Sequence, residues 1–193
     1  MKITIYNFKG GVGKSSISLN LALSLDYGVI TNDIYSPLEK TLTKEHLLKI
    51  KQTENIPDIP QDYNIIYDLG GYIDKRAIKA LQNSDIVIVP TINDYLNLQV
   101  TIDTIQEIEA HNKNIILIAN KTERGDFEKV KSIINEFYSY PILELKKSKS
   151  FQNILIENKS ISQMCQDVGI KAYSYKTINK QFNKLIDTIN NYA

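Results

Sequence analysis

A glycine-rich turn near the start of the chain carries the residues best suited to binding phosphate. Residues 9–16 read Lys-Gly-Gly-Val-Gly-Lys-Ser-Ser and lie between a short apolar run and a stretch with helical periodicity. Glycines let backbone N–H groups turn toward phosphate oxygens without a Cβ clash, and a following helix presents its positive end to the same anion. Lys14 would neutralise the β- and γ-phosphates, and the Ser15 hydroxyl would bind the Mg²⁺ that accompanies a triphosphate. The pattern predicts a Mg-nucleotide site, and a plain glycine-rich turn is the alternative.

The elements that must position this turn alternate along the chain. Strands are expected at residues 3–6, 28–31, 64–67, 85–89, 115–119 and 142–145, and helices at 14–25, 75–82, 96–111, 127–138 and 176–191. Continuous apolar runs between helical segments are typical of a parallel sheet covered on both faces. We therefore expect a doubly wound α/β fold with a mainly parallel sheet. The pattern is poorer over residues 37–60, where one helix over residues 44–50 is expected.

Length and composition favour one cytoplasmic domain. The 193 residues are too few for two comfortable domains, so residues 1–193 are expected to form a single P-loop domain. The chain has 23 Lys and Arg against 22 Asp and Glu, so any contact with nucleic acid must be a local patch. The single cysteine, Cys165, excludes an internal disulfide and is typical of a reducing compartment. No apolar run is long enough to predict a transmembrane helix.

The glycine-rich turn also resembles that of a known family. Residues 7–15, Asn-Phe-Lys-Gly-Gly-Val-Gly-Lys-Ser, resemble the deviant Walker A P-loop of the ParA and MinD ATPases, with Phe8 where the general P-loop pattern has glycine. This resemblance implies that Lys9 reaches across a dimer to the nucleotide of the partner. A cation supplied by the other subunit would make hydrolysis depend on dimerisation. The alternative is that Lys9 is a solvated surface charge.

The segment after the second expected strand departs from the family pattern. The family commonly has Asp-x-Asp-Pro here, whereas residues 31–34 read Thr-Asn-Asp-Ile and keep only the second acid. By resemblance, Asp33 would position the attacking water and support Mg²⁺. An aspartate that caps a helix or a loop is the alternative.

The end of the third expected strand resembles the second switch of the family. Residues 62–71 read Asp-Tyr-Asn-Ile-Ile-Tyr-Asp-Leu-Gly-Gly. The resemblance implies that Asp68 acts like a Walker B residue and holds Mg²⁺ through water. Gly70 and Gly71 replace the more usual prolines, yet they permit a backbone N–H contact to the γ-phosphate and a hinge. An ordinary strand-end turn is the alternative.

Asn120 is the candidate for reading the base. It matches the asparagine that reads the adenine edge in this family, and an amide offers the donor and acceptor that adenine requires. Residues 120–123, Asn-Lys-Thr-Glu, also loosely resemble the guanine-reading Asn-Lys-x-Asp of small GTPases. The glutamate in place of aspartate and the ParA-like P-loop favour ATP.

The last third of the chain contains two candidate surfaces for binding DNA or a membrane, a lysine cluster and the final helix. Lys146, Lys147 and Lys149 follow the last expected strand, where ParA-like proteins carry basic residues for sequence-independent DNA binding. A solvated loop is the alternative. The final helix could pack on the sheet or lie on lipid as a MinD-like tail, and its apolar stripe favours packing. The stripe consists of Ile178, Phe182, Leu185, Ile186 and Ile189.

The resemblance thus implies a ParA-like ATPase that binds Mg-ATP, dimerises around nucleotide, hydrolyses ATP slowly and drives plasmid or chromosome partition. Expected partners are a second copy of the chain, non-specific DNA and a ParB-like centromere-binding adaptor that stimulates hydrolysis; a membrane is not expected. A MinD-like membrane organiser, a conjugation or secretion ATPase and an inactive nucleotide-gated scaffold are the alternatives. The expected catalytic residues are Lys9, Lys14 and Asp33, the nucleotide-binding ones Gly10, Gly11, Val12, Gly13, Lys14, Ser15, Ser16, Asp68, Gly70 and Asn120, and the Mg²⁺ ligands Ser15, Asp33 and Asp68.

Overall fold

The computed structural model, which describes residues 1–51, 53–71 and 74–192, contains a seven-stranded sheet. The strands are β1 Lys2–Ile5, β2 Gly28–Thr31, β3 Leu47–Lys49, β4 Ile65–Asp68, β5 Ile86–Thr91, β6 Ile115–Thr122 and β7 Ile142–Lys146. Their order is β3-β2-β4-β1-β5-β6-β7, and every pairing is parallel. The predicted doubly wound α/β class is therefore confirmed.

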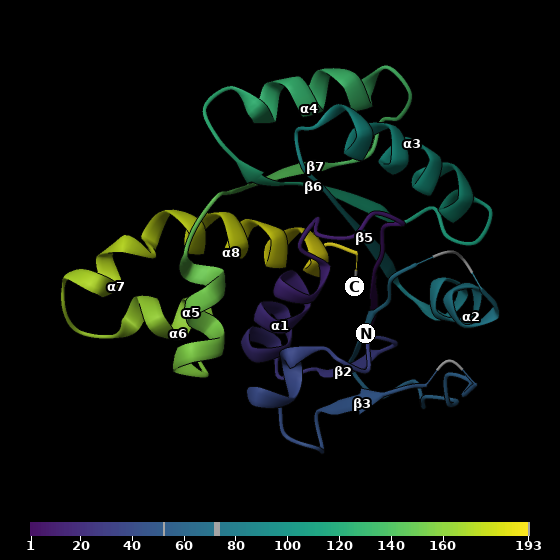
Figure 1. Ribbon diagram of the computed structural model, residues 1–193, viewed down its shortest axis with the longest axis horizontal. Coiled ribbons are helices and arrows are strands. Elements are labelled where there is room, and N and C mark those ends of the chain that lie inside the picture. Colours follow the sequence, from purple (N-terminus) through teal and green to yellow (C-terminus); the bar gives the residue numbers. More distant parts are fainter. Residues whose placement is uncertain (52, 72–73, 193) are drawn as a thin grey trace.

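Helices cover both faces of this sheet (Figure 1). They are α1 Lys14–Leu25, α2 Lys75–Asn83, α3 Tyr95–Glu109, α4 Asp126–Asn135, α5 Ser150–Glu157, α6 Ile161–Gln166, α7 Ile170–Ser174 and α8 Lys176–Asn190, with a 3₁₀ helix at Pro37–Lys40. Helices α2, α3 and α4 pack on one face, α1 and α8 pack on the other, and α5 and α6 form a further layer against α1. The sheet is thus screened from water on both sides.

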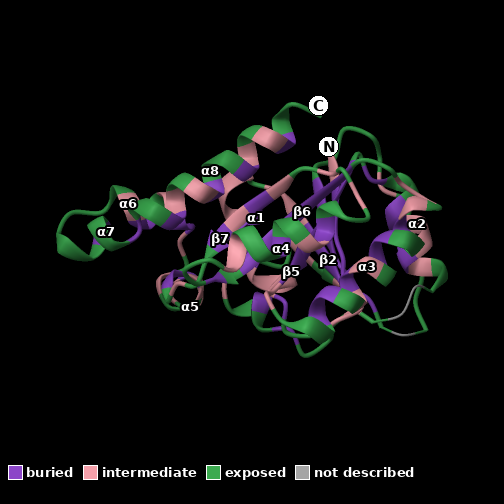
Figure 2. Cartoon of the chain, turned by 90° about the horizontal axis from the view of Figure 1, so that it is seen from above, coloured by how far each residue is buried: buried purple, intermediate pink, exposed green. Residues whose placement is uncertain are grey.

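Successive strand residues point into two different cores. In β1 to β6, residues such as Ile5, Ile88 and Ile116 face α1 and α8, whereas Tyr67 and Leu117 face α2, α3 and α4. Successive side chains of a strand point to opposite faces, so both sets must be apolar when both faces are covered. This explains the continuous apolar runs in the sequence, and β1, β2, β4, β5 and β6 are buried at their centres (Figure 2).

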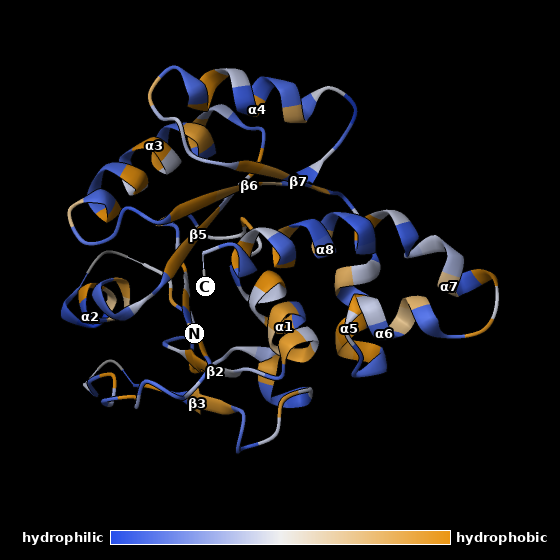
Figure 3. Ribbon diagram, turned by 180° about the vertical axis from the view of Figure 1, so that it is seen from behind, coloured by the Kyte–Doolittle hydropathy of each residue, from blue (hydrophilic) through white to orange (hydrophobic). Residues whose placement is uncertain are grey.

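Helix α1 is apolar around most of its circumference (Figure 3). Its residues 17–22 are all buried, because the sheet covers one side of the helix and α5 and α6 pack on the other. Asn20 lies on that second side, where its Oδ1 accepts a hydrogen bond of 2.8 Å from the backbone N–H of Ile161 at the start of α6. The helix that follows the glycine-rich turn is therefore held rigidly from both sides.

The expected helix over residues 44–50 was wrong. Leu47–Lys49 forms the edge strand β3 instead, which pairs with β2 in the register Val29↔Leu47. A segment this short gains more from pairing with an existing sheet edge than from one isolated helical turn. Helices α5, α6 and α7 were not predicted, because they have only eight, six and five residues.

Helix α8 packs on the sheet, as its apolar stripe predicted. Ile178, Phe182, Leu185 and Ile189 are buried, whereas Lys180 on the same helix is exposed. The apolar stripe that a lipid-binding tail would need is thus already occupied by the core. Among the described residues, no helix has the length and apolar character needed to cross a membrane.

Candidate nucleotide site

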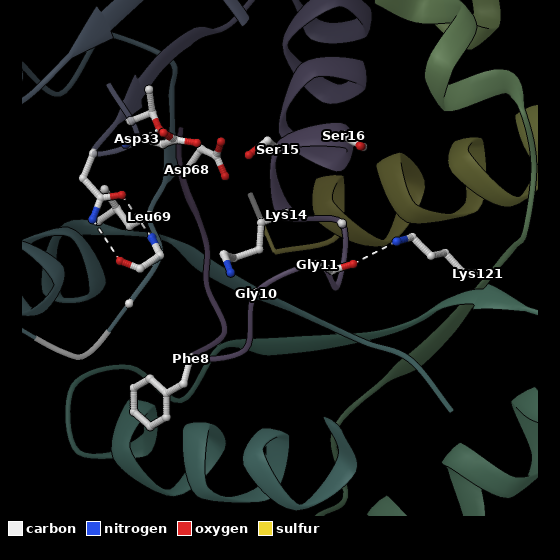
Figure 4. A pocket seen from close by; sticks show the side chains of 15 residues that line it. Phe8, Gly10, Gly11, Lys14, Ser15, Ser16, Asp33, Asp68, Leu69 and Lys121 are labelled. Carbon is white, nitrogen blue, oxygen red and sulfur yellow. Dashed lines mark hydrogen bonds between the residues drawn. The ribbon is translucent and has the colours of Figure 1, made fainter. Parts of the chain in front are cut away.

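A cavity of about 640 Å³ lies at the carboxyl ends of the central strands. Loops that follow β1, β2 and β4 form it together with the first turn of α1 (Figure 4). Its lining consists of Phe8, Gly10, Gly11, Gly13, Lys14, Ser15, Ser16, Thr31, Asn32, Asp33, Asp68, Leu69, Gly70, Gly71 and Lys121. This phosphate cavity is placed where ligands bind in doubly wound sheets.

The glycine-rich loop needs glycine at its last position. Gly13, directly before α1, has φ +100°, and a Cβ there would lie 2.2 Å from Asn120 Nδ2. Asn120 is 2% exposed, and its Nδ2 donates a 2.8 Å hydrogen bond to the carbonyl of Val12. The end of β6 therefore fixes the glycine-rich loop at very close range, and Val12 takes part through its backbone.

Lys14 holds its ammonium group under the loop. Its Nζ donates to the carbonyls of Asn7 and Lys9 at 3.0 and 2.9 Å. Burial lowers the pKa of Lys14, and the nearby charge of Asp68 opposes that shift. The ammonium is thus positioned at the cavity by two carbonyls of the loop itself.

Asp68 brings a buried carboxylate to the cavity. It is 3% exposed, and its Oδ2 has no hydrogen-bond partner among the residues that the structure describes. Burial raises the pKa of Asp68, the Ser15 hydroxyl and the Lys14 ammonium oppose this, and the charge of Asp33 adds to it. A buried carboxylate oxygen of this kind is unusual, and it is suited to binding a cation.

Ser15, Asp33 and Asp68 direct their oxygens toward the same space (Figure 4). Ser15 belongs to α1, Asp33 to the loop after β2, and Asp68 is the last residue of β4. A hydroxyl and two carboxylates are hard oxygen ligands, so this donor set fits Mg²⁺. Asp33 itself is exposed, and its Oδ1 accepts a 3.0 Å hydrogen bond from the backbone N–H of Tyr35.

A contact that the sequence did not indicate joins the loops after β2 and β4. Asn32 Nδ2 donates to the Gly70 carbonyl at 2.9 Å, and the Gly70 N–H donates to Asn32 Oδ1 at 3.1 Å. Gly70 in turn lies against Lys14, because a Cβ on Gly70 would be 3.3 Å from Lys14 Cε. The sequence signal for Asn32 was only its place beside Asp33.

A second cavity, of about 730 Å³, adjoins the first. It shares Gly13, Ser16 and Lys121 with the phosphate cavity, and its other lining residues are Asn120, Lys147, Ser148, Lys149, Phe151, Gln152 and Leu155. Lys121 joins the two, since its Nζ donates to the Gly11 carbonyl at 2.8 Å (Figure 4). An aromatic ring beside an amide suits a planar base, so we refer to this space as the base cavity.

The lysine cluster expected to bind DNA lies partly on the open surface and partly at the base cavity. Lys146, Lys147 and Lys149 are all exposed, yet Lys147 and Lys149 also line the base cavity. Lys147 Nζ lies 2.6 Å from Glu123 Oε1, on the segment that resembles the guanine-reading motif. The cluster therefore lies beside the nucleotide site.

Lys9 is half-buried, and neither cavity is lined by it within the described part of the chain. Its carbonyl accepts from Lys14, and its charge makes a small contribution to the lowered pKa of Asp94, which hydrogen bonds from Asn97 chiefly cause. The structure thus places the Lys9 side chain outside the pocket of its own chain.

No family model and no curated protein matches the sequence, whereas solved structures match the fold. An ATP complex of a McdA variant from Cyanothece has a TM-score of 0.68 at 12% identity, and the alignment covers 98% of this chain and 96% of McdA. MinD with Mg-ADP from Pyrococcus horikoshii has 0.66 at 14%, covering 99% and 98%. A putative plasmid partition protein from Borrelia burgdorferi bound to AMPPNP has 0.61 at 18%, covering 94% and 98%. The chain has the fold of the ParA and MinD deviant Walker A P-loop ATPases.

Proposed function

We propose that residues 1–193 form a single ParA-type ATPase domain that binds Mg-ATP, dimerises around nucleotide, binds DNA without sequence preference and drives plasmid or chromosome partition. The observation that carries this proposal is the meeting of Lys14, Ser15 and the unpartnered Asp68 oxygen in one cavity of a ParA/MinD-type fold. Lys14 and the backbone of the glycine-rich loop bind the phosphates.

The donor set supports the proposed magnesium site. Ser15, Asp33 and Asp68 would hold the ion, directly or through water, and the ion would neutralise charge on the terminal phosphates. Asp33 is the more exposed carboxylate and therefore the one able to accept a proton from, or orient, an attacking water. Hydrolysis is expected to be slow until a partner stimulates it.

The base cavity favours adenine over guanine. Asn120 uses one amide hydrogen on the Val12 carbonyl and one lone pair on the Lys121 N–H, so one donor and one acceptor position remain for a base. Glu123, which stands where a GTPase has its guanine-reading acid, is paired with Lys147 instead. Competition of ATP and GTP for the purified protein tests this, and equal or tighter GTP binding would contradict it.

The DNA and partition parts of the proposal rest on the exposed lysines and on the kind of protein that shares the fold. Clustered lysines bind phosphate through charge without reading bases, and a dimer would double the patch. Among the proteins with this fold is one described as a putative plasmid partition protein. A ParB-like adaptor and a cytoplasmic, nucleoid-associated location complete the proposed role.

A second candidate is an ATPase that acts on a protein machine in conjugation or secretion. The observation that favours it is a group of strongly exposed apolar side chains around α7, where Val168, Ile170 and Tyr173 are 102%, 92% and 70% exposed. A protein partner would bury such residues. An adaptor could use the same surface, so DNA binding decides between the two candidates.

The decisive experiment compares nucleotide binding and DNA binding in one set of variants. Lys14→Ala should weaken Mg-ATP binding by about tenfold to a hundredfold, because it removes a charged phosphate contact. Lys131→Ala, which removes an exposed lysine of α4, serves as the matched control. Wild type that binds no nucleotide in the presence of Mg²⁺ would refute the proposal.

Gel shifts with ATP, with ADP and without nucleotide then test the DNA arm. Tighter DNA binding with ATP is expected, and Lys146→Ala should weaken it without changing ATP affinity, because Lys146 does not line the base cavity. Equal DNA affinity in all three states would contradict the partition role. Liposomes in parallel samples test the MinD-like alternative.

A further inference from the structure

The pair between Asn32 and Gly70 is arranged so that it competes with a nucleotide. Asn32 follows β2 and Gly70 follows β4, and these strands are neighbours with the register Thr31↔Asp68. The two loops therefore leave the sheet side by side, and the Asn32 amide joins them with two hydrogen bonds, at 2.9 and 3.1 Å (Figure 4). Both partners line the phosphate cavity.

Gly70 lies where its N–H could contact the terminal phosphate of a bound nucleotide. An added Cβ at Gly70 would lie 3.6 Å from Lys14 Nζ, so the Gly70 backbone is adjacent to the ammonium that binds the terminal phosphates in the proposed function. The Gly70 N–H is a natural donor to the last phosphate of a triphosphate, yet it is already donated to Asn32 Oδ1. One N–H cannot make two full hydrogen bonds in different directions.

We propose that Asn32 is a positioning residue that sets the preference between triphosphate and diphosphate. Binding of a triphosphate takes the Gly70 N–H from Asn32 and breaks the pair, whereas a diphosphate does not reach Gly70 and leaves the pair intact. Asn32 therefore weakens binding of ATP relative to ADP. Its release also frees the loop that carries Asp33, whose carboxylate is one of the proposed metal ligands.

This inference rests on the proposed function, and affinities for two nucleotides separate the two. Dissociation constants of the non-hydrolysable triphosphate AMPPNP and of ADP, both with Mg²⁺, are measured by calorimetry for wild type, Asn32→Ala and Asn32→Ser. Alanine has no polar group, and serine is too short to bond both Gly70 atoms. Asn114→Ala is the matched control, since it removes an amide that donates a 3.0 Å hydrogen bond to the Asp85 carbonyl, at the amino ends of β5 and β6 and so at the opposite end of the strands from the cavity.

Both Asn32 variants should bind AMPPNP about three- to tenfold more tightly than wild type and ADP equally well, because about one net hydrogen bond no longer has to be broken. A residue that only braces the fold would instead weaken both nucleotides together. An unchanged ratio of the two affinities, or weaker AMPPNP binding, overturns the inference about Asn32 but does not contradict the proposed nucleotide site. If wild type binds neither nucleotide, the proposed function falls and the inference falls with it.

Discussion

Gly13 illustrates how much of the site depends on one missing side chain. Its φ of +100° is strained for any other residue, and a Cβ would collide with Asn120 Nδ2 at 2.2 Å. Gly13→Ala should therefore lower the free energy of unfolding by about 1–3 kcal/mol. Urea denaturation without nucleotide measures this. In Gly10→Ala the new Cβ has no described atom within 4 Å, so the free energy of unfolding of this variant should stay near that of wild type. Equal stability of wild type and both variants would contradict the steric argument.

The buried carboxylate of Asp68 is expected to lower the stability of the fold near neutral pH, although the proposed metal site requires it. Its pKa is raised in the folded protein, so the charged form destabilises the fold above that pKa and has no effect below the ordinary pKa of aspartate. Asp68→Asn should match wild type in acid and become the more stable protein as the pH rises toward neutral. Melting temperatures across this range test the prediction.

Mg-nucleotide should reverse this order at neutral pH. The ion would bind on the side of Asp68 where Oδ2 has no hydrogen-bond partner within the described part of the chain, so it should stabilise wild type by mass action and the Asp68→Asn variant much less. A variant that is less stable than wild type at neutral pH without nucleotide would show that Asp68 is a structural anchor.

At this scale the sequence indicated the residues whose type is itself the signal. Glycines, Lys14, Ser15 and an acid at a strand end carry their chemistry in the motif, and the structure brings them to one cavity. Asn32 could not be predicted, because its role depends on a backbone partner 38 residues away. The lysine cluster was recognised as basic, but its place beside the base cavity depends on how β6 and β7 align.

At the scale of elements, variants of helix α8 distinguish a helix that packs on the sheet from one that binds lipid. Phe182 is 1% exposed in the core between α8 and the sheet, so Phe182→Ala should lower the free energy of unfolding by about 3–5 kcal/mol. Lys180→Ala, on the exposed side of the same helix, should change it by less than about 0.5 kcal/mol. Denaturant unfolding measures both. If Phe182→Ala left the free energy of unfolding unchanged, α8 would not be packed on the sheet, and the membrane-binding alternative would be favoured.

The elements that the sequence predicted well are those whose pattern is repeated over several residues. The bounds of α1 and β2 agree with the expected ranges 14–25 and 28–31. Both elements are buried, so most of their residues are apolar and the apolar run in the sequence marks where each begins and ends. β3 and α5 to α7 were missed because each is too short to show a period. Helix α6 did leave one signal, the capping box of Ser160 and Gln163, which marks a helix start.

At the scale of the whole molecule, the proposed function predicts that a second copy of the chain completes the nucleotide site. Lys9 is not among the described residues that line either cavity of its own chain, which supports its proposed action on the nucleotide of a partner. The prediction is complementation between two inactive variants. Lys9→Ala keeps a complete pocket but supplies no cation, and Asp33→Asn supplies Lys9 but lacks the carboxylate proposed to orient water.

Mixing the two variants should restore ATP hydrolysis that neither shows alone. In a mixed dimer, the Lys9→Ala pocket receives Lys9 from the Asp33→Asn partner, so random pairing of equal amounts gives about one quarter of the wild-type sites. The control replaces Asp33→Asn by the double variant Lys9→Ala with Asp33→Asn, which has no cation to offer and should rescue nothing. If Lys9 acted within its own chain, the mixture would stay inactive, because no pocket would then contain both Lys9 and Asp33. Rescue that grows with total protein concentration would further tie turnover to the association of two chains.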